Sequence, residues 1–312
     1  MRAIWLFLLI FVSLQAVEFA EVGVEPIPDS IPFDEQKARL GKKLYLDANL
    51  SKDKTISCNS CHPLENYGVD NLRLSLGVGG ATNGATNSPT SFNSVFNFVQ
   101  FWDGRAKDLQ EQAAGPLLNP VEHGMTEDAV VAAVKDNPEY VKSFGELYEE
   151  GITFLTITDA IAEFEKTLLT PNSPFDKWLK GDENAITPAA KRGFEAFKSN
   201  GCISCHQGQN VGGNMYQKIG IFEPYNGSGP NGNLGRYNVT QDENDKLVFK
   251  VPSLRNIAKT APYFHDGSVE TLEVAVQLMA FYQLGKFLDN EVVMDIVSFL
   301  ESLTGEYNDK LQ

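Results

Sequence analysis

Two copies of the motif C-x-x-C-H constrain this chain more than any other feature, and together they use all four of its cysteines. The copies occupy residues 58–62 and 202–206. Two thiols on one helical turn can each bond a vinyl group of one porphyrin, and the adjacent histidine then lies beneath the iron as an axial ligand. The sequence therefore predicts two covalently attached c-type haems. Their attachment points and proximal ligands are Cys58, Cys61, His62, Cys202, Cys205 and His206.

Two disulfides, or one zinc ion shared by the two cysteine pairs, are the competing interpretations. Counted from Cys58 to Cys202, the motifs lie 144 residues apart, whereas zinc ribbons separate their pairs by about 15–20 residues. Both copies also end in histidine, although the chain has only four histidines. The pattern favours haem over either alternative.

The length of 312 residues predicts two domains of ordinary size. Residues 170–174, with two prolines, an asparagine and a serine, mark the expected boundary. We therefore expect a first cytochrome c-like domain over 21–171 and a second cytochrome c-like domain over 172–312. The C-terminal tail is a candidate for packing on the first domain. Each half reads as a helix, a short link and C-x-x-C-H, which is a weak internal repeat.

Capping residues and apolar periodicity predict the main helices. Helices are expected after Asp34, after Thr126, near 158–169, from Thr187 to Gly201, and from Asp289 to a stop at Gly305. The Gly- and Asn-rich stretches 77–89 and 208–236 are expected to be loops. Since no segment shows long strand alternation, the predicted fold class is all-α, with two cytochrome c-like haem domains and long loops.

The formal net charge of −15 makes nucleic acid and anionic membrane surfaces poor partners. A basic or locally complementary redox protein is a better partner, because opposite fields speed encounter. The charge is equally well explained as a means of keeping an exported protein soluble.

The N-terminal residues 1–20 are typical of a secretory signal peptide, with Arg2 followed by an apolar run over 4–14. That run is too short to span a bilayer unaided, and no later segment is long and apolar enough to do so. Cleavage after Ala16 or Ala20 is expected, and an uncleaved anchor is the alternative. The sequence predicts a soluble periplasmic protein.

Further motifs resemble those of the bacterial di-haem cytochrome c peroxidases, a family that includes the MauG-type proteins. The match extends over nearly all of the mature chain, from about Ile31 to Gly305. The matching motifs are Asn87-Ser88-Pro89-Thr90, Gln100-Phe101-Trp102-Asp103-Gly104-Arg105, Glu111-Gln112-Ala113, Pro120-Val121-Glu122, Pro252-Ser253-Leu254-Arg255-Asn256-Ile257, Thr260-Ala261-Pro262-Tyr263-Phe264-His265-Asp266-Gly267 and Leu303-Thr304-Gly305-Glu306.

This resemblance implies a division of labour between the haems. The first, on His62, would bind hydrogen peroxide, and the second, on His206, would relay electrons from a donor. The family uses a methionine as the sixth ligand of the relay haem, which raises its potential. Met279 holds the family position, although spacing alone would not choose it over Met215 and core packing is the alternative role.

The resemblance also assigns the catalytic residues. Glu122 would move the proton during cleavage of the O–O bond, since a carboxylate in a poorly solvated pocket can accept and donate it. Gln112 would orient peroxide or water, and Trp102 would lie between the haems. Without the resemblance, Glu122 would be taken for a solvated loop charge and Trp102 for a core residue. The neighbouring pair Asp103 and Arg105 is expected to be structural.

A calcium ion between the domains is also implied by the resemblance. Its ligands would be the side chain of Asn87 and the backbone carbonyls of Thr260 and Pro262, completed by waters. Hard oxygen ligands of this kind suit calcium. The sequence contains no acidic cluster like an EF-hand loop, so its residues alone do not predict this site.

The chain departs from the family at Val78, where many members carry a histidine that blocks the peroxidatic iron until the relay haem is reduced. Because an apolar side chain cannot coordinate iron, we expect an open first haem that needs no reductive activation. His123, where many relatives have methionine, is a replacement ligand, a second proton-transfer group or a surface residue. If Glu122 faces the iron in an extended loop, His123 is expected to face away.

Three functions follow from these features. The leading hypothesis is a peroxidase that reduces hydrogen peroxide to water with electrons from a small cytochrome c or copper protein. The second is a MauG-type oxidase that modifies a partner protein; those proteins lack the relay methionine, so Met279 counts against it. The third is a non-enzymatic di-haem electron carrier, against which Val78 counts. The donor and the oligomeric state stay open, with a homodimer as one option.

Overall fold

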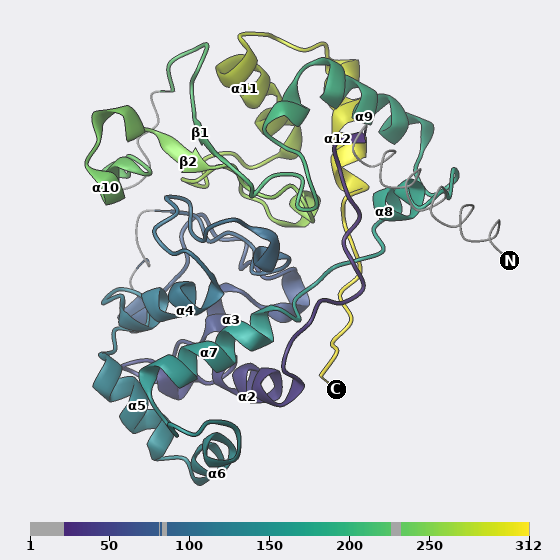
Figure 1. Ribbon diagram of the computed structural model, residues 1–312. Coiled ribbons are helices and arrows are strands. Elements are labelled where there is room, and N and C mark those ends of the chain that lie inside the picture. Colours follow the sequence, from purple (N-terminus) through teal and green to yellow (C-terminus); the bar gives the residue numbers. More distant parts are fainter. Residues whose placement is uncertain (1–21, 81, 83–85, 226–231, 312) are drawn as a thin grey trace, which may run out of the picture.

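The computed structural model describes residues 22–80, 82, 86–225 and 232–311. These residues form two stacked lobes (Figure 1), a first lobe with α2 to α7 and a second lobe with α8 to α12 and the strands β1 and β2. The predicted signal peptide, residues 1–20, lies outside the described residues.

Helices dominate both lobes, and the strands are short. The first lobe contains α2 (Glu35–Tyr45), α3 (Cys58–Cys61), α4 (Leu109–Leu118), α5 (Glu127–Lys135), α6 (Pro138–Leu147) and α7 (Phe154–Glu165). The second lobe contains α8 (Pro174–Leu179), α9 (Pro188–Ser199), α10 (Tyr237–Thr240), α11 (Leu272–Leu284), α12 (Asn290–Glu301), β1 (Tyr216–Lys218) and β2 (Val248–Lys250).

Side-chain caps begin the helices where the sequence predicts. The Asp34 carboxylate accepts hydrogen bonds from two backbone amides at the start of α2. Thr126 and Thr187 cap α5 and α9 in the same way. Each cap satisfies backbone donors that have no partner inside the helix. These three helix starts are confirmed, whereas α12 ends at Glu301 and not at the predicted Gly305.

A close helix crossing, built on a glycine, recurs in both lobes. In the first lobe α2 crosses α7 at Gly41, where a Cβ atom would lie 1.8 Å from the carbonyl oxygen of Ala160. In the second lobe α9 crosses α12 at Gly193, where a Cβ atom would lie 1.8 Å from the carbonyl oxygen of Asp295. The glycine lets two backbones approach closely, and it lies on the helix that precedes a C-x-x-C-H motif, α2 in the first lobe and α9 in the second. The predicted internal repeat is therefore visible as a helix pair in each lobe.

The two chain ends cross between the lobes (Figure 1). Val24 is fully buried in the hydrophobic core of the second lobe, with Phe175, Phe194 and Phe299. Leu311 is buried in the core of the first lobe, with residues of α2 and α7. Each lobe is thus completed by a segment from the far end of the chain.

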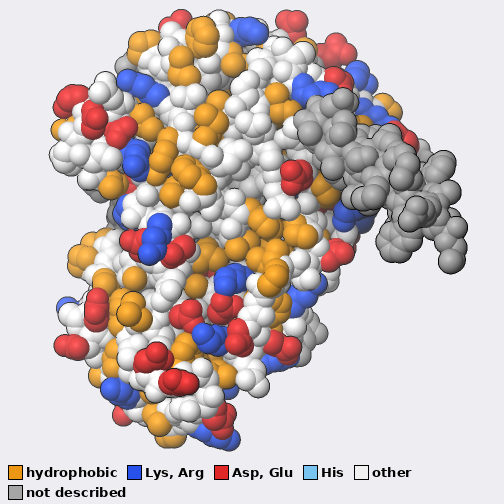
Figure 2. Space-filling view, viewed as in Figure 1, with side chains coloured by type: hydrophobic (Ala, Val, Ile, Leu, Met, Phe, Trp, Pro, Cys, Tyr) orange, Lys and Arg blue, Asp and Glu red, His pale blue; other side chains and the backbone are white. Residues whose placement is uncertain are grey.

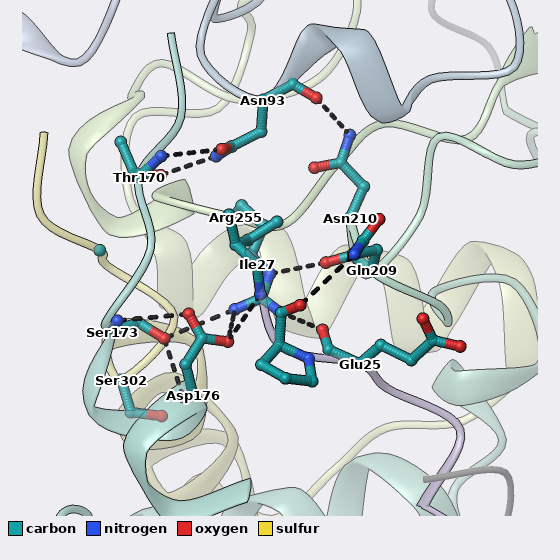
Figure 3. A network of polar contacts seen from close by, with 12 residues as sticks. Glu25, Ile27, Asn93, Thr170, Ser173, Asp176, Gln209, Asn210, Arg255 and Ser302 are labelled. Carbon is teal, nitrogen blue, oxygen red and sulfur yellow. Dashed lines mark hydrogen bonds and ion pairs between the residues drawn. The ribbon is translucent and has the colours of Figure 1, made fainter. Parts of the chain in front are cut away.

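A buried ion pair fixes the N-terminal segment to the second lobe (Figure 3). Arg255 Nη1 lies 2.7 Å from Asp176 Oδ1, and both side chains are at most 1% exposed. The other two guanidinium nitrogens also donate hydrogen bonds. Nη2 donates to the Glu25 carbonyl at 2.7 Å, and Nε donates to the Gln209 carbonyl at 2.9 Å. A buried charge of this kind is tolerated only when it is paired and hydrogen-bonded.

Hydrogen bonds from two asparagine side chains connect the two lobes in the same region. Asn93 of the first lobe donates to Thr170 Oγ1 at 2.7 Å and accepts from its backbone amide. Its own carbonyl accepts a hydrogen bond from Asn210 Nδ2 of the second lobe at 3.2 Å (Figure 3). These buried bonds hold the lobes in register around the sites described below.

One of the two strands lies in a segment that the sequence predicts to be a loop. β1 pairs with β2 in antiparallel register, with Tyr216 opposite Lys250, so the expectation of loop throughout 208–236 is wrong at β1. The pairing also brings the end of β2 against the first lobe, because the Lys250 backbone amide donates to the Trp102 carbonyl at 2.7 Å. The fold is helix-rich, and this small sheet forms part of the contact between the lobes.

The surface carries charges of both signs. On the face shown in Figure 2, acidic and basic side chains are interspersed over both lobes. None of the helices within the described ranges is both long and apolar enough to cross a membrane.

Candidate functional site

Both C-x-x-C-H motifs present their histidine in the same way. The backbone amides of His62 and His206 donate to the carbonyls of Cys58 and Cys202, which closes a helical turn around each motif. The His62 Nδ1 atom lies 3.0 Å from the Gly68 carbonyl oxygen. The His206 Nδ1 atom lies 3.3 Å from the Val211 carbonyl oxygen. Since a carbonyl only accepts, Nδ1 carries the proton and Nε2 is left to bind a metal, the usual arrangement of a metal-ligating histidine.

The chemical state of these residues suits haem attachment. None of the four cysteines is paired in a disulfide. Burial lowers the pKa of both histidines, that of His206 to about 4, so both rings are neutral at pH 7 as a ligand must be. In the part of the chain that the structure describes, no three His, Cys, Asp or Glu side chains gather into a metal-binding cluster. The motifs face two different cavities, which is inconsistent with one zinc ion shared between them.

The first cavity lies behind the motif of the first lobe. Its walls include the attachment residues Cys58, Cys61 and His62. The predicted catalytic residues Glu122, Gln112 and Trp102 line the same cavity. These attachment and catalytic residues, which span 64 positions of the sequence from Cys58 to Glu122, are brought around one space because α3, α4 and the loop after α4 converge there.

Glu122 sits in this cavity on a tight turn that follows α4. Its backbone amide donates to the Asn119 carbonyl at 3.1 Å, and Asn119 Nδ2 donates to Glu122 Oε1 at 2.7 Å. Burial raises the pKa of Glu122, while the charge of Arg105 and the bond from Asn119 act in the opposite direction. The result is an oriented carboxyl in a poorly solvated site, which is the environment that general acid–base chemistry requires.

His123 also lines the first cavity, so the expectation that it faces away from the side of Glu122 is wrong. The alternation argument assumed an extended backbone, whereas residues 119–124 form a turn. The ring is 3% exposed, and its Nδ1 lies 2.8 Å from the Leu50 carbonyl oxygen. Because a carbonyl only accepts, Nδ1 carries the proton, and Nε2 is the nitrogen without a proton.

Val78 lies in a loop that packs against this turn. Its backbone amide donates to the Glu122 carbonyl at 2.9 Å. A Cβ atom on Gly77 would lie 1.9 Å from the Val121 carbonyl oxygen, so the two backbones touch at this point. Atoms of the Val78 side chain lie close to Gly124. The loop therefore contributes a backbone contact that supports Glu122.

The second cavity is larger, about 510 Å³, and lies behind the motif of the second lobe. It is lined by Cys202, Cys205 and His206, and by Met279 from α11. Met215 is not among the residues that line it. Met125 packs against the core of the first lobe, and Met294 is 52% exposed. Of the four methionines after Met1, Met279 is therefore the one that shares a cavity with His206.

One wall is common to the two cavities. Trp102, Asn87 and Lys250 line both of them. The Trp102 indole Nε1 donates to the Asn87 carbonyl at 2.9 Å, which fixes the ring between the cavities. Trp102 thus lies in the wall that the two cavities share.

The residues expected to bind calcium also lie together. Asn87, Thr260 and Pro262 line the second cavity. The Asn87 Nδ2 atom donates to the Leu72 carbonyl at 2.9 Å, so the amide oxygen is the atom available as a ligand. Asp103 and Arg105 form the expected ion pair, with 3.0 Å between Arg105 Nη1 and Asp103 Oδ1.

Two buried polar atoms in the cavities were not predicted as site atoms. Glu165 Oε2 in the first cavity and His265 Nε2 in the second have no hydrogen-bond partner within the described residues. Burial raises the pKa of Glu165 to about 8. Glu165 follows Ile161 by four residues and so lies on the apolar face of α7. An acidic residue on an apolar helix face is the sequence signal that could have identified it as a site residue. Orphaned polar atoms beside thiols and neutral histidines fit a bound tetrapyrrole.

Comparison with known proteins agrees with these observations. The family model for di-haem cytochrome c peroxidases matches residues 35–184. Cytochrome c peroxidase Ccp of Escherichia coli (strain K12) is 52% identical over 299 residues, which cover 95% of this chain and 64% of that protein. Cytochrome c551 peroxidase of Nitrosomonas europaea is 47% identical over 312 residues, which cover 96% of this chain and 91% of that protein.

MauG proteins are more distant. The methylamine utilization protein MauG of Methylorubrum extorquens is 32% identical over 294 residues, which cover 90% of this chain and 82% of that protein. Among solved structures, a MauG-like protein associated with microbial copper homeostasis has a TM-score of 0.77 and 29% identity, covering 90% of this chain and 93% of that one. The chain therefore belongs to the di-haem cytochrome c peroxidase family, and it is more similar to the cytochrome c peroxidases of Escherichia coli and Nitrosomonas europaea than to this MauG.

Proposed function

We propose that this protein reduces hydrogen peroxide to two molecules of water, using two protons and two electrons from a small redox protein. The observation that carries the proposal is Glu122, a half-buried and oriented carboxyl in the cavity that the His62 side chain also lines. The similarity to cytochrome c peroxidases supports the same activity.

The haem bound through Cys58, Cys61 and His62 would supply the redox chemistry that breaks the O–O bond. Glu122 would accept a proton from one peroxide oxygen and deliver it to the other, which leaves as water. Its raised pKa suits both halves of that transfer. Asn119 would hold the carboxyl in place, and Gln112 would orient the peroxide by hydrogen bonding.

Electrons would enter through the second cavity. His206 and Met279 would be the axial ligands there, and Met/His ligation gives the higher potential that a relay needs. Trp102 would then lie on the route to the first site. Ile221 lines the second cavity and is 51% exposed, so the cavity wall reaches the surface where a donor could dock. A small cytochrome c or copper protein with a basic face would complement the net charge of −15.

Two further properties belong to this proposal. A calcium ion would bind at the contact between the lobes, held by the Asn87 side chain and the carbonyls of Thr260 and Pro262. Residues 1–20 would direct export, so that the haems are attached and the enzyme works in the periplasm. Met279 in the second cavity counts against a MauG-type oxidase, since those proteins lack that ligand.

Steady-state turnover of hydrogen peroxide with a reduced small cytochrome c tests the proposal. We expect two molecules of one-electron donor to be oxidised for each peroxide consumed. Spectra of the oxidised and half-reduced forms, recorded on the same sample, would identify the haem that reacts. A protein that carries both haems and exchanges electrons with the donor, but does not turn over peroxide, would contradict the proposal.

A further inference from the structure

Lys250 is a buried cation whose counter-charge the protein does not supply. Its side chain is 5% exposed, at the end of β2. Burial lowers its pKa to about 8, and no charged neighbour contributes to that change. Within the described residues, its Nζ atom forms no ion pair and no hydrogen bond. Lysine is almost never fully buried unless it is paired, so this position calls for an anion.

The place of Lys250 indicates where that anion would come from. Lys250 lines both cavities, and its backbone amide is bonded to the carbonyl of Trp102 in their common wall. The described residues that line the second cavity include no aspartate or glutamate. The first cavity has Glu122 and Glu165, and neither lies within 4.0 Å of the ammonium, the limit for an ion pair.

We infer that the Lys250 ammonium binds a propionate carboxylate of haem at the wall between the two sites. The inference rests on the proposal that each cavity holds a haem. A haem brings two carboxylates with it, and a carboxylate buried next to an ammonium satisfies both charges. The propionate could belong to either haem, because Lys250 reaches both cavities. A fixed positive charge there favours the reduced iron of the haem that it pairs with, and it lies beside Trp102 on the route between them.

The test is the midpoint potential of each haem in the intact two-haem protein, measured by spectroelectrochemical titration. We expect Lys250→Met to lower the potential of the paired haem, because loss of the positive charge favours the oxidised iron. Lys250→Arg keeps the charge and should keep the potential. Lys218→Met removes the same charge from an exposed position on the paired strand β1 and should leave both haems unchanged.

The haem whose potential falls identifies the source of the propionate, and a fall in both means that the ammonium is shared. Unchanged potentials in Lys250→Met would overturn the inference and leave Lys250 a packing residue. If that variant does not retain two haems, Lys250→Gln, which keeps a polar end, replaces it with the same expectation. A wild-type protein with two haems but no peroxide turnover would reject the proposed function and leave this inference standing.

Discussion

At the residue scale, the first cavity contains two adjacent side chains that are held in place by different contacts. Glu122 and His123 line the same cavity but are anchored differently, Glu122 by Asn119 and His123 by the Leu50 carbonyl. The anchor on Glu122 occupies Oε1 and the anchor on His123 occupies Nδ1, so each contact engages one polar atom of its side chain. The turn over 119–124 lets both side chains line the cavity, because an extended backbone would have sent the two side chains to opposite sides.

Replacing Glu122 with glutamine should keep both haems while peroxide turnover falls about 10²–10⁴-fold, the usual worth of general acid–base catalysis. Burial raises the pKa of the carboxyl, and its basic form is the active one. Wild-type kcat/KM should therefore fall as the pH drops through that raised pKa, and the variant should lack this acid limb. Glu149→Gln, at an exposed position, is the matched control. Near-normal turnover in Glu122→Gln would remove Glu122 from the mechanism.

Met279→Leu should lower the midpoint potential of the second haem, because loss of the thioether removes a ligand that favours reduced iron. The electronic spectrum should lose its Met/His signature at the same time. Met294→Leu, at a half-exposed position on α12, should change neither property. If Met279→Leu has the wild-type potential and spectrum, another residue is the ligand, and Met215 is the next to replace.

The third residue-scale prediction concerns the spin state of the first haem. With Val78 in place of a blocking histidine, the oxidised protein should show a high-spin first haem that reacts with peroxide before the second haem is reduced. The competing view is that His123 ligates the iron, since it lines the cavity. Electron paramagnetic resonance of wild type and His123→Ala separates the two. A low-spin signal that disappears in His123→Ala would defeat the open-site prediction.

At the scale of elements, helix starts could be predicted from single capping residues, because a cap is a local interaction. Asp34, Thr126 and Thr187 all act as predicted. The strand β1 was missed, since three residues carry too little alternation to be recognised and its stability comes from pairing with a distant partner. The end of α12 was misplaced because Gly305 serves a different purpose. A Cβ atom there would lie 1.9 Å from the Thr170 carbonyl, so that glycine allows a close approach between chain segments.

The crossing of α2 and α7 yields a stability prediction. Gly41→Ala places a methyl group against the Ala160 carbonyl, and overpacking of this kind costs about 1–3 kcal/mol. The midpoint of denaturation of the haem-loaded protein, followed by circular dichroism, should fall accordingly. Gly145→Ala on α6 is the control, since nothing lies within 4 Å of the added atom. Alanine there should be neutral or stabilise by up to about 1 kcal/mol. Equal midpoints for the two variants would contradict the crossing described here.

At the scale of the whole molecule, the site could be predicted as far as local motifs and the family resemblance reach. The attachment residues follow from their spacing alone, whereas Glu122 and Met279 needed the resemblance because a lone acid or methionine carries no signal. Lys250 could not be predicted as a site residue. Its significance lies in burial without a charged partner between two cavities, and that depends on how the two lobes meet and not on any local pattern.

The central claim is that each C-x-x-C-H cavity holds one covalently attached haem, and the mass of the denatured protein tests it most directly. We predict that the mature chain, after acid–acetone extraction, retains two haems per polypeptide by intact mass spectrometry. Replacing Cys202 and Cys205 with serine should leave one. A wild-type chain that retains a single haem, or none, or that carries zinc instead would contradict the account.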